Sequence, residues 1–130
     1  MSISYTFTKA ERLKSQKKIG RLFKERQSIG AYPLRIFWAE TEHEENEYPA
    51  SMAFSVSKKT FKHAVKRNRY KRLMREVHRL NKHKLYQQLE DCNKSVDLML
   101  LYVGKEPHDF STIERKYLRL IDKLISQISS

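Results

Sequence analysis

The chemistry most strongly indicated by the sequence is the binding of a polyanion by one basic segment. Between Lys58 and Lys84 the chain holds twelve Lys and Arg residues and a single acid, Glu76. The whole chain has a formal net charge of +12, so this segment carries almost all of the excess. A basic surface gathered in one segment is typical of a site for nucleic acid or an anionic membrane, whereas a scattered excess would only improve solubility.

The basic segment has helical spacing, with an apolar side and a cationic side. At about 100° per residue, the apolar residues between Tyr70 and Leu80 fall on one side of a helix. Lys66 and Arg69 fall nearer to this apolar side. Six polar residues fall on the opposite side: Arg67, Asn68, Lys71, Arg72, Arg75 and Arg79. Arginine suits phosphate binding because its planar guanidinium forms paired hydrogen bonds and stacks on bases. A solvated helix normally mixes charges of both signs, so this bias favours a nucleic-acid partner.

No group of residues has the pattern of a catalytic site within the protein itself. The five histidines are scattered, and none is paired with another at the i+4 spacing of a helical metal site. Cys92 has no evident base partner, and no Gly-rich phosphate-binding loop is present. We therefore expect neither catalytic residues nor a metal site in this chain.

The N-terminal half is predicted to contain a helix and two strands. Thr8 and Glu11 have the spacing of a capping box for a short first turn. A helix is predicted over 16–26, with three apolar residues buried at helical spacing: Ile19, Leu22 and Phe23. Alternating apolar residues predict strands at 34–38 and 50–56. The acidic stretch 41–47 is predicted to form the hairpin loop between them.

The C-terminal half is predicted to contain the basic helix, a strand and a final helix. The basic helix is expected over 62–80, with a shorter helical stretch to about residue 91. The apolar run 96–103 has the length of a buried strand. Ser111 and Glu114 have capping-box spacing ahead of a long amphipathic helix. The order of these elements predicts an α+β sandwich of one sheet with helices.

Length and composition set the class of protein. The chain has 130 residues, the size of one domain, and 39% of them are hydrophobic, so residues 1–130 are predicted to form a single domain with its own core. No apolar run is long enough to span a membrane, and Met1–Ala10 lacks the apolar centre of a signal peptide. One cysteine agrees with a reducing compartment. We therefore expect a cytoplasmic protein.

These residues resemble the signature of the bacterial ribonuclease P protein. The resemblance rests on Phe54–Lys59 followed by Ala64–Glu76, with Arg67-Asn68-Arg69 at its centre. It extends to Glu11–Leu13 near the start and to Val96–Leu101 near the end, and so covers nearly all of the chain. Ile19 stands where many members of the family have an aromatic residue.

The resemblance implies a fold, a partner and a reaction. The expected order is α-β-β-β-α-β-α, with a roughly four-stranded sheet, three helices and a left-handed crossover that carries the basic helix. The third early strand would come from splitting 48–57 or its flank. The expected partners are a large catalytic RNA, the ribonuclease P RNA, and precursor tRNA, whose 5′ leader is removed by hydrolysis. In this family Mg²⁺ is held chiefly by the RNA and the substrate, so the protein is a non-catalytic subunit.

The resemblance also implies that the chain is a single RNA-binding domain, and it implies roles for individual residues. The expected contacts to the catalytic RNA are Lys58, Lys59, Arg67, Asn68, Arg69, Lys71, Arg72, Arg75 and Arg79. The expected contacts to the leader are Ile19, Phe23 and Phe37. Exposed aromatic rings give base-stacking surfaces that tolerate many sequences, as leader binding requires. However, Phe23 follows Ile19 at i+4, and such a stripe is more often core, so both roles remain open for these three residues.

Three other functions compete with this hypothesis. A ribosomal protein could use the same basic helix, but the joint spacing of the strand motif and the Arg-Asn-Arg run favours the ribonuclease P protein. A DNA-binding regulator would need a second helix joined by a short turn ahead of the recognition helix, and none is predicted. A membrane-surface helix would need bulky aromatic residues on its apolar side, and this helix has few. We therefore expect neither DNA nor a membrane as partner.

Overall fold

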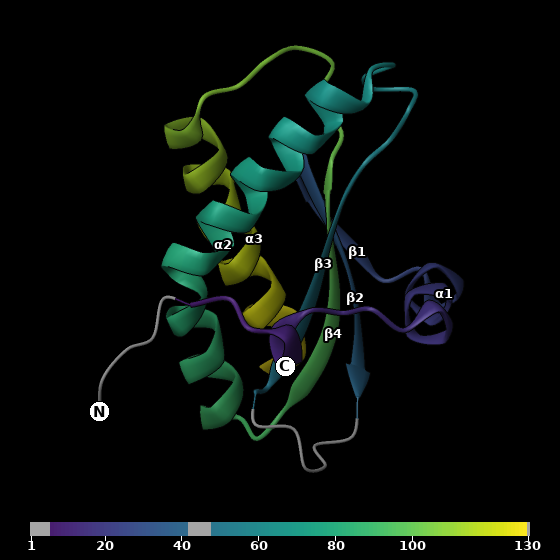
Figure 1. The fold of residues 1–130 in the computed structure, drawn as a ribbon. Helices are drawn as coiled ribbons and strands as arrows, with labels where there is room; N and C mark the ends of the chain where they lie inside the picture. Colours follow the sequence, from purple (N-terminus) through teal and green to yellow (C-terminus); the bar gives the residue numbers. More distant parts are fainter. Residues whose placement is uncertain (1–5, 42–47, 130) are drawn as a thin grey trace.

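The computed structural model describes residues 6–41 and 48–129 (Figure 1). The predicted loop 41–47 therefore lies almost entirely outside the described residues. The elements, in chain order, are a short 3₁₀ turn (Lys9–Glu11), α1 (Gln16–Glu25), β1 (Ser28–Ala31), β2 (Leu34–Thr41), β3 (Ala50–Val56), α2 (Ala64–Asp91), β4 (Ser95–Tyr102) and α3 (Phe110–Ser129). None of the described helices is long and apolar enough to cross a membrane.

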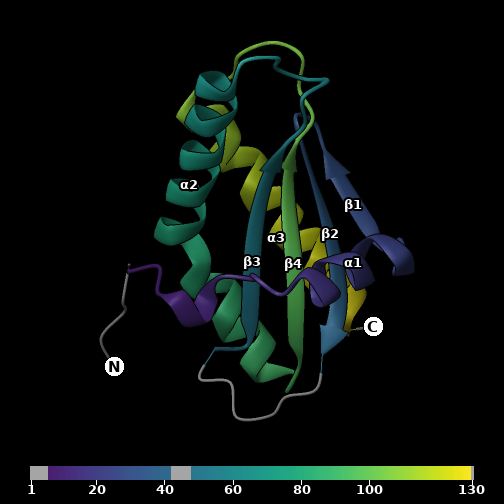
Figure 2. The same cartoon turned by 45° about the vertical axis from the view of Figure 1, so that its right-hand side comes forward.

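The four strands form one mixed sheet in the order β1-β2-β4-β3. β2 pairs antiparallel with both β1 and β4, and β3 pairs parallel with β4. In Figure 2 both parallel strands run upward, β4 lies to the right of β3, and α2 belongs to the layer behind the sheet. This β3–α2–β4 crossover is therefore left-handed, against the strong general preference for right-handed connections. The predicted α+β class and element order are confirmed.

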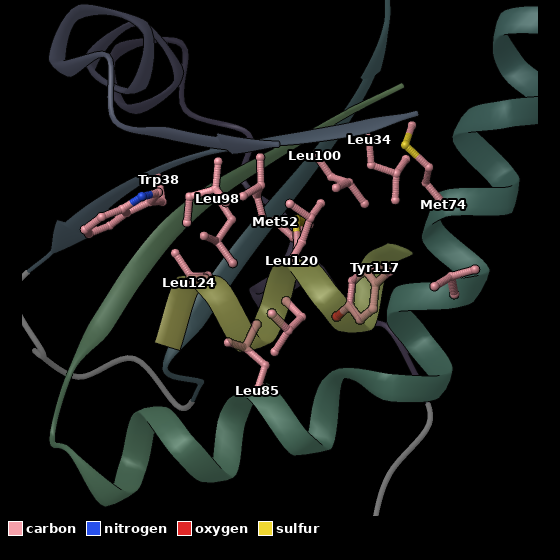
Figure 3. Close-up of a cluster of buried hydrophobic side chains, with 14 of the residues drawn as sticks. Leu34, Trp38, Met52, Met74, Leu85, Leu98, Leu100, Tyr117, Leu120 and Leu124 are labelled. Atoms are coloured by element: carbon pink, nitrogen blue, oxygen red, sulfur yellow. The ribbon is translucent and has the colours of Figure 1, made fainter. Parts of the chain in front are cut away.

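One face of the sheet packs against α2 and α3 and forms the main core. The inward residues of the strands alternate with outward ones, as the sequence pattern predicts, so that Leu34, Ile36 and Trp38 are all buried. Figure 3 shows Leu120 and Leu124 of α3 directed toward this layer. All five of these residues belong to one buried cluster, which is the main source of hydrophobic stabilisation.

The other face of the sheet carries α1 and a much smaller cluster (Figure 2). Its buried members are Leu13, Leu22, Ala39 and Met99. Ile19 and Phe37 are partly buried against them. Phe23 is 44% exposed. The prediction that α1 buries Ile19, Leu22 and Phe23 is therefore right only for Leu22, because a single helix of ten residues covers only part of this face.

The segment before α1, residues 7–13, is held against the main core, and we call it the N-terminal strap. Glu11 is fully buried and accepts hydrogen bonds from Lys82 Nζ (2.5 Å) and Tyr86 Oη (2.6 Å). Lys82 Nζ also donates to the carbonyl of Thr6. The Glu11 carboxylate accepts from the backbone N–H of Thr8 at 2.9 Å, as the predicted capping box requires. These contacts anchor the chain on α2 before it crosses to the other face.

Three predicted features differ in the structure. The third early strand is β1, at Ser28–Ala31, and does not come from residues 48–57. The basic helix is continuous to Asp91 and does not break near Leu80, because Lys82 is buried in its ion pair with Glu11 and the helix keeps an inward side there. α3 is capped by Asp109, whose Oδ1 accepts from the Thr112 N–H at 2.9 Å, and the predicted cap at Ser111 is wrong.

Candidate RNA interface

The cationic side of α2 is positioned by the burial of its opposite side. Tyr70, Met74 and Val77 are buried in the main core, which turns the arginine-rich side away from it. Leu73 and Leu80, which the helical pattern also placed on the apolar side, are only partly buried. Four residues of the predicted interface on α2 are exposed: Asn68, Arg69, Arg72 and Arg75.

Three of the predicted RNA contacts on α2 form a row beside the edge of the sheet. Arg67, Lys71 and Arg75 recur every four residues, so they lie along one side of α2. The guanidinium of Arg75 lies over the ring of Phe54, 5.8 Å from its centroid. Because Phe54 belongs to β3, the edge strand, this places the row over that edge. The row therefore offers cations next to half-buried aromatic surface.

Arg67 forms hydrogen bonds within the protein. Its Nη1 donates to the carbonyls of Phe61 at 2.8 Å and Lys62 at 2.6 Å. These carbonyls belong to the segment just before α2, so the side chain ties the helix to the preceding turn. The sequence pattern could not reveal this, because the same spacing fits an arginine directed to solvent. Arg67 remains a predicted RNA contact, with a structural role added.

Lys58 and Lys59 lie in the turn that Arg67 helps to hold. The turn follows β3, and both lysines are exposed. Ser57 closes it, because its carbonyl accepts from the N–H groups of Thr60 and Phe61 at 3.1 and 3.2 Å. The turn therefore presents two cations close to the start of the basic helix.

Arg79, at the far end of the cationic side, is paired with the one acid there. Its Nη2 lies 2.5 Å from Glu76 Oε1. This pairing lowers the pKa of Glu76 and raises the pKa of Arg79. The pair cancels one positive charge, so the predicted RNA contacts form a stronger anion-binding surface toward the start of α2 than at Arg79.

The predicted leader residues come together on the opposite face of the sheet. The rings of Phe23 and Phe37 lie with their centroids 5.1 Å apart. Ile19 packs on the same small cluster as Phe37. Phe23 from α1 and Phe37 from β2 therefore form one partly exposed aromatic surface. This arrangement could stack an unpaired base.

A buried acid under α1 was missed by the sequence analysis. Asp97 of β4 is 3% exposed, and its Oδ2 has no hydrogen-bond partner among the described residues. Burial raises the pKa of Asp97, and the nearby cations Lys18 and Arg21 act in the opposite direction. The signal in the sequence was a single acid within the apolar run 96–103. Asp97 is therefore a buried acid on the α1 side of the sheet, where Lys18 and Arg21 of α1 favour its charged form and burial opposes it.

The interface has no protein metal site within the described part of the chain. No three His, Cys, Asp or Glu side chains among residues 6–41 and 48–129 come together to hold an ion. The described residues therefore do not fit an all-protein Mg²⁺ site.

Comparison with known proteins identifies the family. The family model described as ribonuclease P matches residues 7–125. The ribonuclease P protein component of Porphyromonas gingivalis is 35% identical over 127 residues, covering 98% of this chain and 92% of the relative. The corresponding protein of Chlorobium phaeobacteroides is 31% identical over 125 residues, covering 89% and 86%.

Solved structures share the fold. The RNase P protein of Staphylococcus aureus superposes with a TM-score of 0.69 at 20% identity, covering 89% of this chain and 96% of that one. The RNase P protein of Thermotoga maritima superposes with a TM-score of 0.66 at 24% identity, covering 87% and 96%. The sequence match over nearly the whole chain and the shared fold show that this chain belongs to the ribonuclease P protein family.

Proposed function

We propose that this chain is the RNA-binding protein subunit of a ribonuclease P and assists the Mg²⁺-dependent removal of the 5′ leader from precursor tRNA. The cationic side of α2 and the turn with Lys58 and Lys59 bind the catalytic RNA. The surface of Ile19, Phe23 and Phe37 binds the single-stranded leader. Mg²⁺ is held by the RNA and the substrate, which supply the hydrolytic chemistry.

The observation that carries this proposal is the separation of two complementary surfaces. Arginine forks on α2 suit the phosphates of a folded RNA, whereas paired aromatic rings suit unpaired bases. α2, which carries the arginines, and α1, which carries Phe23, lie on opposite faces of one sheet (Figure 2). A protein built in this way can contact a structured RNA and a flexible strand at the same time. A general RNA-binding protein needs only the first surface.

Reconstitution tests the proposal. The purified protein, a bacterial ribonuclease P RNA and labelled precursor tRNA are mixed at low Mg²⁺, and the 5′ cut is measured. We expect efficient cleavage only when protein and RNA are both present. If the protein adds nothing even with its cognate RNA, the subunit function is wrong and a ribosomal or general RNA-binding role becomes the better hypothesis.

A matched comparison tests where the chemistry occurs. The protein alone is incubated with the same substrate, after its preparation has been checked for contaminating ribonuclease. We expect no cut. Cleavage by the protein alone at the mature 5′ end would contradict the assignment of catalysis to the RNA.

A further inference from the structure

The N-terminal strap holds one end of the helix that carries Phe23. The last residue of the strap is Leu13, and α1 begins at Gln16. Leu13 is fixed twice: its side chain is buried in the small cluster under α1, and its N–H donates to the carbonyl of Met52 in β3 at 3.1 Å. Because so little chain separates Leu13 from α1, a shift of the strap is passed on to the start of the helix.

The rest of α1 is held by the sheet. β1 begins at Ser28, close behind the end of α1 at Glu25. The side chain of Arg21 donates from Nη2 to the carbonyl of Glu40 in β2 at 2.7 Å. The helix contributes one fully buried residue, Leu22, to the cluster beneath it. With so small an apolar seat, the angle of α1 on the sheet depends on both of its ends, and the strap fixes the N-terminal one.

The strap is fixed on α2 by a buried polar anchor. The Glu11 carboxylate accepts hydrogen bonds from Lys82 Nζ and Tyr86 Oη of α2. The same carboxylate accepts from the N–H of Thr8, so it also holds the turn of the strap. Glu11 is 0% exposed and Lys82 is 3% exposed. The place of the strap on α2 is therefore set by directional hydrogen bonds and not by packing alone.

The anchor lies on the same side of α2 as the row of predicted RNA contacts that ends at Arg75. Lys82 follows Arg75 by seven residues, about two turns, and Tyr86 follows by about one turn more. The Arg75 guanidinium covers the ring of Phe54, and that ring packs against Phe7 of the strap with centroids 5.8 Å apart. Figure 2 shows the strap crossing from α2 past β3 to α1. It therefore links the row to α1.

We propose that Glu11 and Lys82 are positioning residues for leader binding. Through the strap they set the place of α1, and so of Phe23, relative to the side of α2 that binds the catalytic RNA. Both side chains are buried, so they act without touching RNA. A buried ion pair is often no more stabilising than an apolar pair of similar volume, so its distinct contribution here is a defined geometry. This inference rests on the proposed function and deepens it, because it names what aligns the two RNA-binding surfaces.

Two double variants that both lack the buried ion pair test the proposal. In Glu11→Gln/Lys82→Met, the amide oxygen at position 11 can still accept from the Thr8 N–H and from Tyr86 Oη. In Glu11→Leu/Lys82→Met, no acceptor remains. The affinity of each assembled holoenzyme is measured for precursor tRNA and for mature tRNA. We expect the first variant to keep the preference of the unmodified protein for the precursor. The second should lose about tenfold of it, the order of one stacked base. Equal preference in the two variants would overturn the proposal.

A variant of the main core separates position from stability. Leu120→Ala weakens the core on the other face of the sheet, away from the strap. All affinities are measured well below the melting temperature of every variant. We expect Leu120→Ala to keep the precursor preference, and its loss there too would show a general effect of stability and exclude a positioning role. An unmodified protein with no precursor preference would instead contradict leader binding itself, and the strap proposal with it.

A photocrosslink from α1 measures position directly. In a Cys92→Ser background, the exposed position next to Phe23 carries an azidophenacyl group through Lys24→Cys. We expect crosslinks to a narrow set of leader nucleotides, which shift or spread when Glu11→Leu/Lys82→Met is added. Lys62→Cys, just before α2, is the control, and its crosslinks to the catalytic RNA should stay in place. Leader crosslinks from position 24 that do not move would show that the anchor does not position α1.

Discussion

The two faces of the sheet differ in how completely they are covered. The face under α2 and α3 has a large closed core, in which Leu98, Leu100 and Leu120 are fully buried. The face under α1 has four buried residues and an aromatic side chain, Phe23, that is 44% exposed. The first face holds the fold together, and the second retains apolar surface that can bind a ligand. Stability and recognition are thus separated across one layer of strands.

The N-terminal strap connects the two faces. Removing the ion pair that holds it on α2 should have the largest effect on the free energy of unfolding. Lys82→Met leaves the Glu11 carboxylate buried without its cation, so we expect a loss of about 3–5 kcal/mol in the free energy of unfolding. Urea unfolding followed by circular dichroism measures it. The double variant Glu11→Leu/Lys82→Met should recover much of the loss. If the single variant is as stable as the double variant, the buried pair is not an anchor.

The same truncation of a buried leucine should cost different amounts of unfolding free energy on the two faces. Leu120→Ala opens a cavity in the closed core and should cost about 2–5 kcal/mol in the free energy of unfolding. Leu22→Ala, at an equally buried residue of α1, should cost less, because a helix seated on a small cluster can shift to fill the space. Both are measured by denaturant unfolding. Equal losses would contradict the difference between the faces.

The exposed ring of α1 should affect binding more than stability. Phe23→Ala should weaken the binding of precursor tRNA by about 1–3 kcal/mol, the usual contribution of one stacked base. Binding of mature tRNA, which lacks the leader, should stay unchanged, and the unfolding free energy should change little. The affinity of the holoenzyme for both RNAs measures the effect. A loss of binding that is the same for both RNAs would remove Phe23 from the leader surface.

Two arginines of the same motif should differ in their effects on RNA binding and on thermal stability. Arg72→Gln should reduce the salt slope of binding to the catalytic RNA by about 1 and leave thermal stability unchanged, because Arg72 is exposed. Arg67→Gln should lower the melting temperature, because the carbonyls of Phe61 and Lys62 lose their donor. Filter binding at several salt concentrations and thermal melts measure the two effects. Identical behaviour of the two variants would contradict the structural role of Arg67.

The smallest expected effect is the pH dependence of folding stability that the buried His78 of the closed core causes. Burial, with a smaller contribution from the charge on Lys82, lowers the pKa of His78 to about 3, although Glu11 acts in the opposite direction. The unfolded chain therefore binds a proton that the folded chain does not, so stability falls as pH drops below about 6.5, by under about 1 kcal/mol at pH 6.

Replacing the histidine isolates its share of this pH dependence. His78 Nδ1 lies 2.7 Å from Tyr117 Oη. His78→Leu removes that contact and should flatten the change in melting temperature between pH 7.5 and pH 5.5, whatever its effect on stability at pH 7.5. Glu11, whose carboxyl pKa lies below its usual range because hydrogen bonds from Lys82, Thr8 and Tyr86 outweigh burial, stays ionised in this interval. An unchanged pH dependence would exclude His78 as its source.

The sequence predicted those elements whose pattern is long and regular. Alternation in β2 and β3 and the helical spacing of α3 are strong signals, and both are confirmed. β1 was not predicted, because Ser28–Ala31 has only four residues and includes a glycine. The strand exists because it pairs with β2 in the sheet, which is a tertiary effect.

The candidate site could be predicted by residue type but not by orientation. The spacing of Arg67 to Arg79 correctly indicated a cationic side of α2. It could not distinguish Arg67, which bonds to backbone carbonyls, from Arg72, which is exposed. Lys66 and Arg69 fall near the apolar side of the helical wheel, and both border a depression whose other wall comes from residues 107–110. That wall lies about forty residues later in the chain, so helical spacing alone cannot relate it to α2.

The strap has a consequence for the newly made chain. Glu11 leaves the ribosome early, but its partner Lys82 follows 71 residues later. At about 5–20 residues per second, the segment waits roughly 4–14 s for that partner. During this interval α1 has no anchor on the helical layer, and β3 cannot yet pair with β4. The aromatic surface of α1 is therefore assembled only late in synthesis, so a chain truncated before residue 82 should be a poor competitor for RNA.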